Sequence, residues 1–150
     1  MKDPNHRLLI SLMAVSFLFL VVISTPSSAL EDYMTVDDVT MSLRRGDALM
    51  EMNYTLNSFA YLYVLALGCN YIEPELASIF KSFGDAKITR ADPYSAAFVI
   101  KDAGRNTHGY YLFDSKPLGS RISRLKVVYP GGISKTFFNV TSTPNVFCEA

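Results

Sequence analysis

"FAYLYVLALGC", residues 59–69, places nine consecutive apolar side chains before a Gly-Cys pair. The fold depends on whether this stretch crosses a membrane or belongs to a globular domain. Nine residues of helix extend about 14 Å, roughly half of the apolar layer of a bilayer, which is about 30 Å thick. The stretch is therefore too short for a membrane span, and it predicts the centre of a globular core.

Residues 58–67 are predicted to form a helix, because suitable residues stand at both ends. Asn57 and Ser58 precede the apolar run as capping residues, and Gly68 follows it as a terminator. Tyr, Val and Phe also favour strands, so a buried strand is the alternative. A helix that is apolar on every face is normally buried, and we expect this one in the core.

A second helix is predicted in "EPELASIFKSFG", residues 73–84. Four apolar side chains fall at i, i+3, i+4 and i+7 and share one helical face: Leu76, Ile79, Phe80 and Phe83. Acidic residues and a proline stand in the first turn, Lys81 stands in the last turn, and Gly84 ends the segment.

The rest of the domain predicts strands. Residues 39–43 and 48–56 alternate apolar and polar side chains around an Arg-Gly-Asp turn, which predicts a hairpin with one dry face. Five further apolar segments are separated by turn sequences: residues 86–91, 96–101, 110–113, 124–129 and 133–140. The predicted fold is α+β, with a mainly antiparallel sheet of six or seven strands and a two-helix insertion packed on one face.

Residues 1–29 have the order of an export signal. Lys2 and Arg7 precede a charge-free run of sixteen residues, 8–23, and small residues follow. A cut after Ala29 would leave residues 30–150 as a single domain. The alternative is an uncleaved N-terminal membrane anchor, although sixteen residues of helix extend only about 24 Å. The basic residues before the run predict an extracytoplasmic domain in both cases, either secreted or anchored to the cell membrane.

The charge of this domain argues against one class of partner. Residues 30–150 carry 12 basic and 13 acidic side chains, without a basic run. Nucleic-acid binding needs clustered Lys and Arg, so no nucleic acid is expected as a partner. Contact with the membrane is expected only through the N-terminal apolar segment, if that segment is retained.

Cys69 and Cys148 both lie in the predicted exported domain, where a disulfide between them is expected if the geometry allows it. The bridge would close a loop of about 80 residues and stabilise the fold by roughly 4–5 kcal/mol in the chain-entropy model. The alternative is two separate buried thiols. His108 is the only histidine of residues 30–150 and has no cluster of ligands beside it, so neither a metal site nor a cofactor is predicted.

Two sequons, at Asn53 and Asn139, predict glycosylation, and either site can remain unused. Asn53 is expected on the wet face of its strand, where a glycan has room.

Two Ser-x-x-Lys matches raise the question of an enzyme. Ser78 with Lys81, and Ser123 with Lys126, fit a pattern in which a neutral lysine activates a serine nucleophile. Both residue types are common enough in this chain for such matches to arise by chance. We predict no catalytic residue and interpret the protein as a non-enzymatic binding or structural module. The alternative is a small extracytoplasmic hydrolase with a Ser/Lys or a carboxylate site.

Four longer patterns carry a resemblance: "NYTLNSFAYLYVLALG", "EPELASIFKSFG", "GYYLFDSKPLG" and "VVYPGGISKTFFNVTSTPNVF". Together they resemble uncharacterised exported or membrane-anchored proteins of methanogenic archaea, over most of residues 35–147. The resemblance implies a location in the cell envelope and implies no activity.

The segment "GYYLFDSKPLGSR", residues 109–121, is the predicted binding surface for an unknown envelope component. Strand alternation places Tyr111 and Phe113 on one face, and Lys116 and Arg121 lie close by in the sequence. The interpretation that we favour over this candidate binding surface is that the face belongs to the core and is covered by a second layer, such as the C-terminal tail that contains Cys148.

Overall fold

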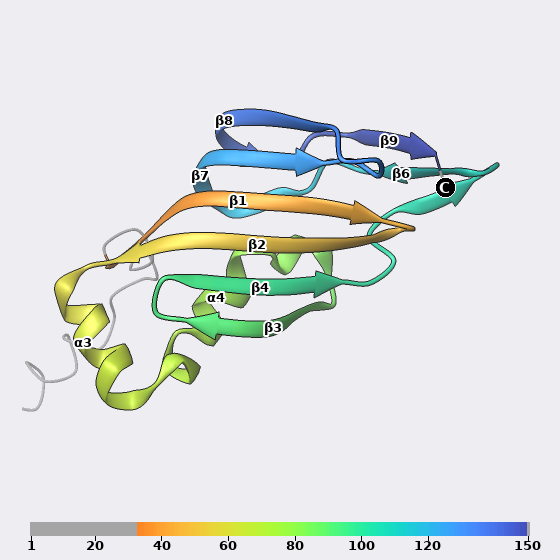
Figure 1. Cartoon of the computed structure of the whole chain (residues 1–150). Coiled ribbons are helices and arrows are strands. Elements are labelled where there is room, and N and C mark those ends of the chain that lie inside the picture. Colours follow the sequence, from red (N-terminus) through yellow and green to blue (C-terminus); the bar gives the residue numbers. More distant parts are fainter. Residues whose placement is uncertain (1–32, 150) are drawn as a thin grey trace, which may run out of the picture.

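The computed structural model describes residues 33–149. It shows a mixed six-stranded sheet, a helical segment between the second and third strands, and a separate three-stranded sheet (Figure 1). The predicted α+β class is confirmed. The predicted export signal or anchor and the cleavage site at Ala29 lie outside the described residues.

The main sheet has the strand order β3-β4-β2-β1-β7-β8. Its strands are β1 (Met34–Arg44), β2 (Asp47–Leu56), β3 (Ala86–Asp92), β4 (Ser95–Ile100), β7 (Pro117–Val128) and β8 (Ser134–Ser142). Neighbours are antiparallel, except that β1 and β7 run parallel. The two hairpins predicted on either side of the helical segment are present as β1–β2 and β7–β8.

One face of this sheet forms the core. The alternating apolar residues of β1, β2, β4 and β7 are almost fully buried on it, as in Val39, Met50, Phe98 and Leu125. Burying such side chains contributes roughly 1.5–3 kcal/mol each, which explains why the register of the strands is well defined.

The helical segment consists of α3 (Ser58–Leu67), a 3₁₀ turn η1 (Cys69–Tyr71), α4 (Glu73–Ile79) and a 3₁₀ turn η2 (Lys81–Phe83). Figure 1 shows α4 behind the sheet, where it covers the core face. Leu76, Ile79 and Phe80 are buried as predicted, and the ring of Phe80 meets that of Phe98 edge-on at 4.8 Å. The predicted single helix of residues 73–84 is interrupted at Phe80, which is the C-cap of α4.

Helix α3 has the boundaries that the sequence predicts, but the prediction that it is buried in the core is wrong. The backbone N–H of Ala60 donates to the Asn57 side chain at 2.9 Å, and Gly68 ends the helix with a φ of 88°. Only Val64 is buried. The reason is its position: α3 continues from the end of β2 beyond the edge of the core, and it packs on the rest of the described chain through one side (Figure 1).

The small sheet has the order β5-β6-β9, formed by β5 (Arg105–Thr107), β6 (Tyr110–Phe113) and β9 (Val146–Glu149). Phe113 and Val146 face each other in the register and are both buried. The C-terminal tail thus forms a strand beside β6 in the same sheet, rather than a second layer over it.

Within residues 33–149, no helix has the length and apolar character needed to cross a membrane.

Candidate functional site

The face of the main sheet opposite α4 is open, and it is the candidate functional site. No element of the described chain covers it in the view of Figure 1. Neighbouring strands align polar side chains across this face. One row in the register runs from Glu51 through Thr40 and Lys126 to Thr136, and the next contains Asn53, Asp38 and Arg124.

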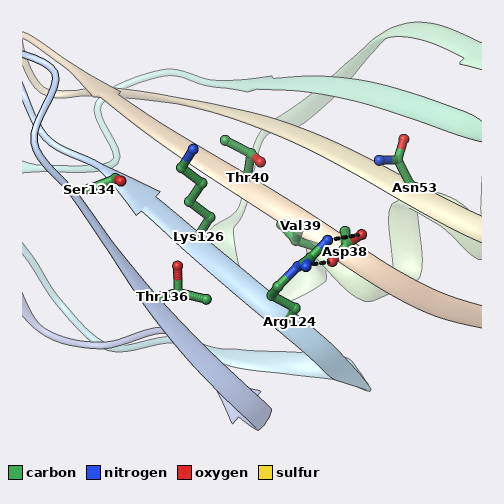
Figure 2. Close-up of a pocket in the computed structure, with 8 residues that line it drawn as sticks. All are labelled: Asp38, Val39, Thr40, Asn53, Arg124, Lys126, Ser134 and Thr136. Atoms are coloured by element: carbon green, nitrogen blue, oxygen red, sulfur yellow. Dashed lines mark hydrogen bonds and ion pairs between the residues drawn. The ribbon is translucent and has the colours of Figure 1, made fainter.

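At its centre the open face has a hollow of about 440 Å³, between β2, β1, β7 and β8. Figure 2 shows the residues that line it: Asp38, Val39, Thr40, Asn53, Arg124, Lys126, Ser134 and Thr136. The lining groups are mainly hydroxyls, an amide and charged side chains, and all except Val39 are polar. The hollow is therefore suited to polar ligand groups.

A bidentate ion pair crosses the parallel strands at one end of the hollow. Nη2 of Arg124 donates to Oδ2 of Asp38 at 2.7 Å, and Nε donates to Oδ1 (Figure 2). The hydrogen bond and the charge of Asp38 raise the pKa of Arg124. A bulge in β1 after Val36 brings Asp38 to the open face while Val36 and Val39 both remain buried.

Lys126 lies one step further along β7, opposite Thr40 in the register. Its side chain is exposed, and within residues 33–149 it forms no ion pair. Ser134 and Thr136 add hydroxyl groups from β8. The hollow thus offers one unpaired ammonium group beside a guanidinium group and several hydrogen-bonding groups, an arrangement that can hold hydroxyl or anionic groups of a ligand.

The predicted binding residues are not gathered on one surface. Phe113 is 2% exposed, and Tyr111 is half-buried with its ring against Gly46. Lys116 is half-buried and Arg121 is exposed on β7. Tyr111 and Phe113 therefore belong to the core or pack against it, with the Tyr111 ring close to Gly46 and the Phe113 ring close to Gly104.

The predicted disulfide is not formed. Both thiols are free and half-buried. Cys69 lies near Tyr54, toward one end of β2. Cys148 pairs with Tyr111, whose ring packs on Gly46 just beyond the other end of that strand. Eight residues of strand extend about 26 Å, whereas the Cα atoms of a disulfide lie about 4–7 Å apart, so this fold keeps the two thiols separate.

Burial raises the pKa of both thiols. For Cys69, the carboxylates of Asp92 and Glu73 raise the pKa further. The structure has two separate thiols, as in the alternative to the disulfide, although both are half-buried rather than fully buried.

The two sequons lie on different parts of the sheet. Asn53 is exposed and lines the hollow of the open face (Figure 2). Asn139 is exposed on β8, where it adopts a φ of 52°. A glycan on Asn53 would occupy the hollow, so glycosylation there and binding in the hollow are competing uses of one surface.

The Ser-x-x-Lys matches do not form a catalytic pair in the structure. The hydroxyl of Ser78 donates to the backbone carbonyl of Glu75 at 2.7 Å, which is a local helical bond. Lys81 is exposed on η2, and Ser123 and Lys126 are exposed on β7 without a hydrogen bond to each other.

Residues 33–149 contain no cluster of three His, Cys, Asp or Glu side chains that could hold a metal ion.

Sequence reasoning missed the group formed by Asp38, Arg124 and Lys126. The alternation of Arg124 and Lys126 with buried Leu125 does predict that both basic residues share an open face. Their neighbour across the parallel strands could not be predicted, because Asp38 is 86 residues away in the sequence.

No protein-family model, no curated protein and no solved structure matches this chain.

Proposed function

We propose that this protein is a non-enzymatic binding module of the cell envelope and that it holds a polar envelope component on the open face of its sheet. The observation that carries the proposal is the uncovered hollow in which Lys126, free of any ion-pair partner in the described chain, lies beside Arg124. The partner would present hydroxyl and anionic groups.

The expected location rests on residues 1–29, with their basic start, apolar run and small residues before Ala29. Cleavage would release a secreted module, and retention would anchor it in the cell membrane. Both outcomes would put the open face outside the cytoplasm, where envelope material is within reach.

The state of the possible reactive groups supports binding over hydrolysis. Asp38 accepts two hydrogen bonds from Arg124, so both oxygens of its carboxylate are already engaged. Ser78 is hydrogen-bonded within its own helix, on the side of the sheet that faces away from the hollow. The hydrolase alternative therefore gains no support from these positions.

A co-sedimentation experiment tests the proposal. The full chain is mixed with the insoluble envelope fraction of its own cells, and the bound fraction is measured as a function of protein concentration. Lys126→Glu reverses one charge in the hollow and should weaken binding roughly tenfold or more, since a hydrogen bond to a charged group contributes about 1.5–3 kcal/mol.

Lys81→Glu is the matched control, because it makes the same charge change at an exposed site on the α4 side of the sheet. Its binding should equal that of the unmodified chain. Equal binding by all three proteins, or equal weakening by both variants, would refute the open face as the binding site.

A further inference from the structure

Helix α3 exposes a continuous apolar surface. Phe59, Leu62, Tyr63 and Ala66 follow the i, i+3, i+4, i+7 spacing of one helical face, and Phe59 and Leu62 are 69% and 62% exposed. Leu65 and Leu67 extend this surface on either side. Large apolar side chains gathered in this way mark a contact surface rather than ordinary scattered exposure.

Tyrosine rings stand within this apolar surface and beside it. Tyr63 lies between Phe59 and Tyr71, with ring centroids 4.9 and 5.8 Å apart, respectively. On the other side of the helix, the hydroxyls of Tyr61 and Tyr94 are hydrogen-bonded at 2.7 Å. Such rings with polar tips are typical of side chains that sit at the boundary between lipid tails and water.

No charged residue occurs between Glu51 and Glu73, a segment that contains all of α3. A partner with a charged surface would have no counterpart on this helix. The absence of charge also removes the usual cost of placing a helix against lipid tails.

The N-terminal apolar segment joins the described fold beside α3. The backbone N–H of Asn57, the N-cap of α3, donates to the carbonyl of Tyr33 at 2.8 Å. Nine residues, 24–32, separate Tyr33 from the apolar run at residues 8–23. Nine residues span at most about 30 Å, so a membrane that holds residues 8–23 lies within reach of α3.

We propose that α3 docks on the surface of a lipid bilayer. Phe59, Leu62 and Leu65 insert among the upper acyl chains, and the tyrosine hydroxyls remain at the headgroups. The helix lies in the plane of the interface and does not span the membrane. Since the segment carries no charge, docking requires neither anionic lipid nor low salt.

Two other occupants of this surface are conceivable, and the experiment distinguishes them from lipid. They are a second copy of the chain and the N-terminal apolar segment folded back on α3. Either would cover the helix with protein and keep acyl chains away from it.

The chain contains no tryptophan, so a single introduced tryptophan is a specific reporter. The full chain carrying Leu65→Trp is reconstituted into uncharged phosphatidylcholine vesicles, with and without bromine on the acyl chains. Bromine quenches tryptophan fluorescence only on close approach. We expect a loss of roughly half of the emission, because an interfacial helix buries its apolar face about 5–10 Å below the headgroups.

Ile133→Trp is the matched control. Ile133 is 74% exposed in the turn between β7 and β8, away from α3, so its replacement should fold equally well and remain unquenched. Combining Leu65→Trp with Leu62→Glu should reduce the quenching at least twofold, because a buried charge opposes insertion.

Equal, weak quenching at both positions would overturn the proposal. In that case, blue-shifted emission from Leu65→Trp would identify a protein covering, either the N-terminal segment or a second copy, whereas emission typical of water would identify an uncovered helix. Neither result bears on the open face of the sheet, whose test uses Lys126.

Discussion

Tyr54 shows how a single buried side chain couples this fold to pH. It is 2% exposed, and its hydroxyl donates to the backbone carbonyl of Asp92. Burial raises its pKa above the ordinary value of 10.0, and the nearby Cys69 and Asp92 raise it further. Burial, followed by Glu75, likewise raises the pKa of Tyr33 to about 12.

Stability should therefore fall in strongly alkaline solution. The unfolded chain releases these phenolic protons near pH 10, whereas the folded chain retains them, so the contribution is complete below about pH 10 and is lost as the pH rises through the raised values. Urea unfolding at about pH 9 and about pH 11 measures this loss. Tyr54→Phe should lose less stability between the two pH values than the unmodified chain.

Tyr54→Phe also removes the hydrogen bond to Asp92, so it should start about 0.5–1.5 kcal/mol less stable at the lower pH. Tyr110→Phe, at an exposed tyrosine, serves as the control and should retain the full pH dependence. A pH dependence of Tyr54→Phe as steep as that of the control would argue against this account.

Helix α3 separates two properties that usually occur together, helical structure and burial. Val64 is 2% exposed, whereas its neighbour Leu65 is 59% exposed. Val64→Ala should lower the free energy of unfolding by about 1–3 kcal/mol, because two buried methyl groups are lost. Leu65→Ala should change it by about 0.5 kcal/mol or less.

Thermal or urea unfolding of each single variant measures the two changes in the free energy of unfolding, which are then compared. If Leu65→Ala proved as destabilising as Val64→Ala, the exposed side of α3 would be packed against protein, and docking on lipid would lose its basis.

The boundaries of α3 could be predicted from the sequence because they depend on local groups. Asn57 caps the first turn through its own side chain, and Gly68 adopts a conformation that other residues rarely adopt. Burial could not be predicted in the same way, because it depends on which distant elements reach the helix. The position of the C-terminal strand could not be predicted for the same reason. β9 pairs with β6 through backbone groups, and no local pattern in the sequence indicates this pairing.

The candidate site shows the same division between local and distant information. The alternation in β7 predicts that Arg124 and Lys126 point to one face. The parallel pairing of β1 with β7 brings Asp38 to Arg124 as an ion-pair partner. Among residues 33–149, Lys126 has no such partner. The sequence pattern of either strand alone does not predict which of the two basic residues pairs with Asp38.

At the scale of the whole molecule, the N-terminus decides whether α3 docks alone or together with an anchor. The intact mass of the protein isolated from its native membrane or medium should correspond to a chain that begins at Leu30, because the small residues before it suit a signal peptidase. If the protein in the membrane fraction has a mass that includes Met1 or Lys2, the signal is not cleaved and the protein is anchored rather than secreted.

The parallel pairing of β1 with β7 also has a consequence for the order of folding. The hairpins β1–β2, β3–β4 and β7–β8 each close a short loop, whereas joining Asp38 to Arg124 closes a loop of 86 residues. Long loops cost more entropy before their contacts form, and such topologies fold slowly. The pairing of β1 with β7 therefore forms only after the segment that contains β7 has been synthesised. Under the proposed export of this chain, the delay would keep it unfolded while it passes through a translocation channel.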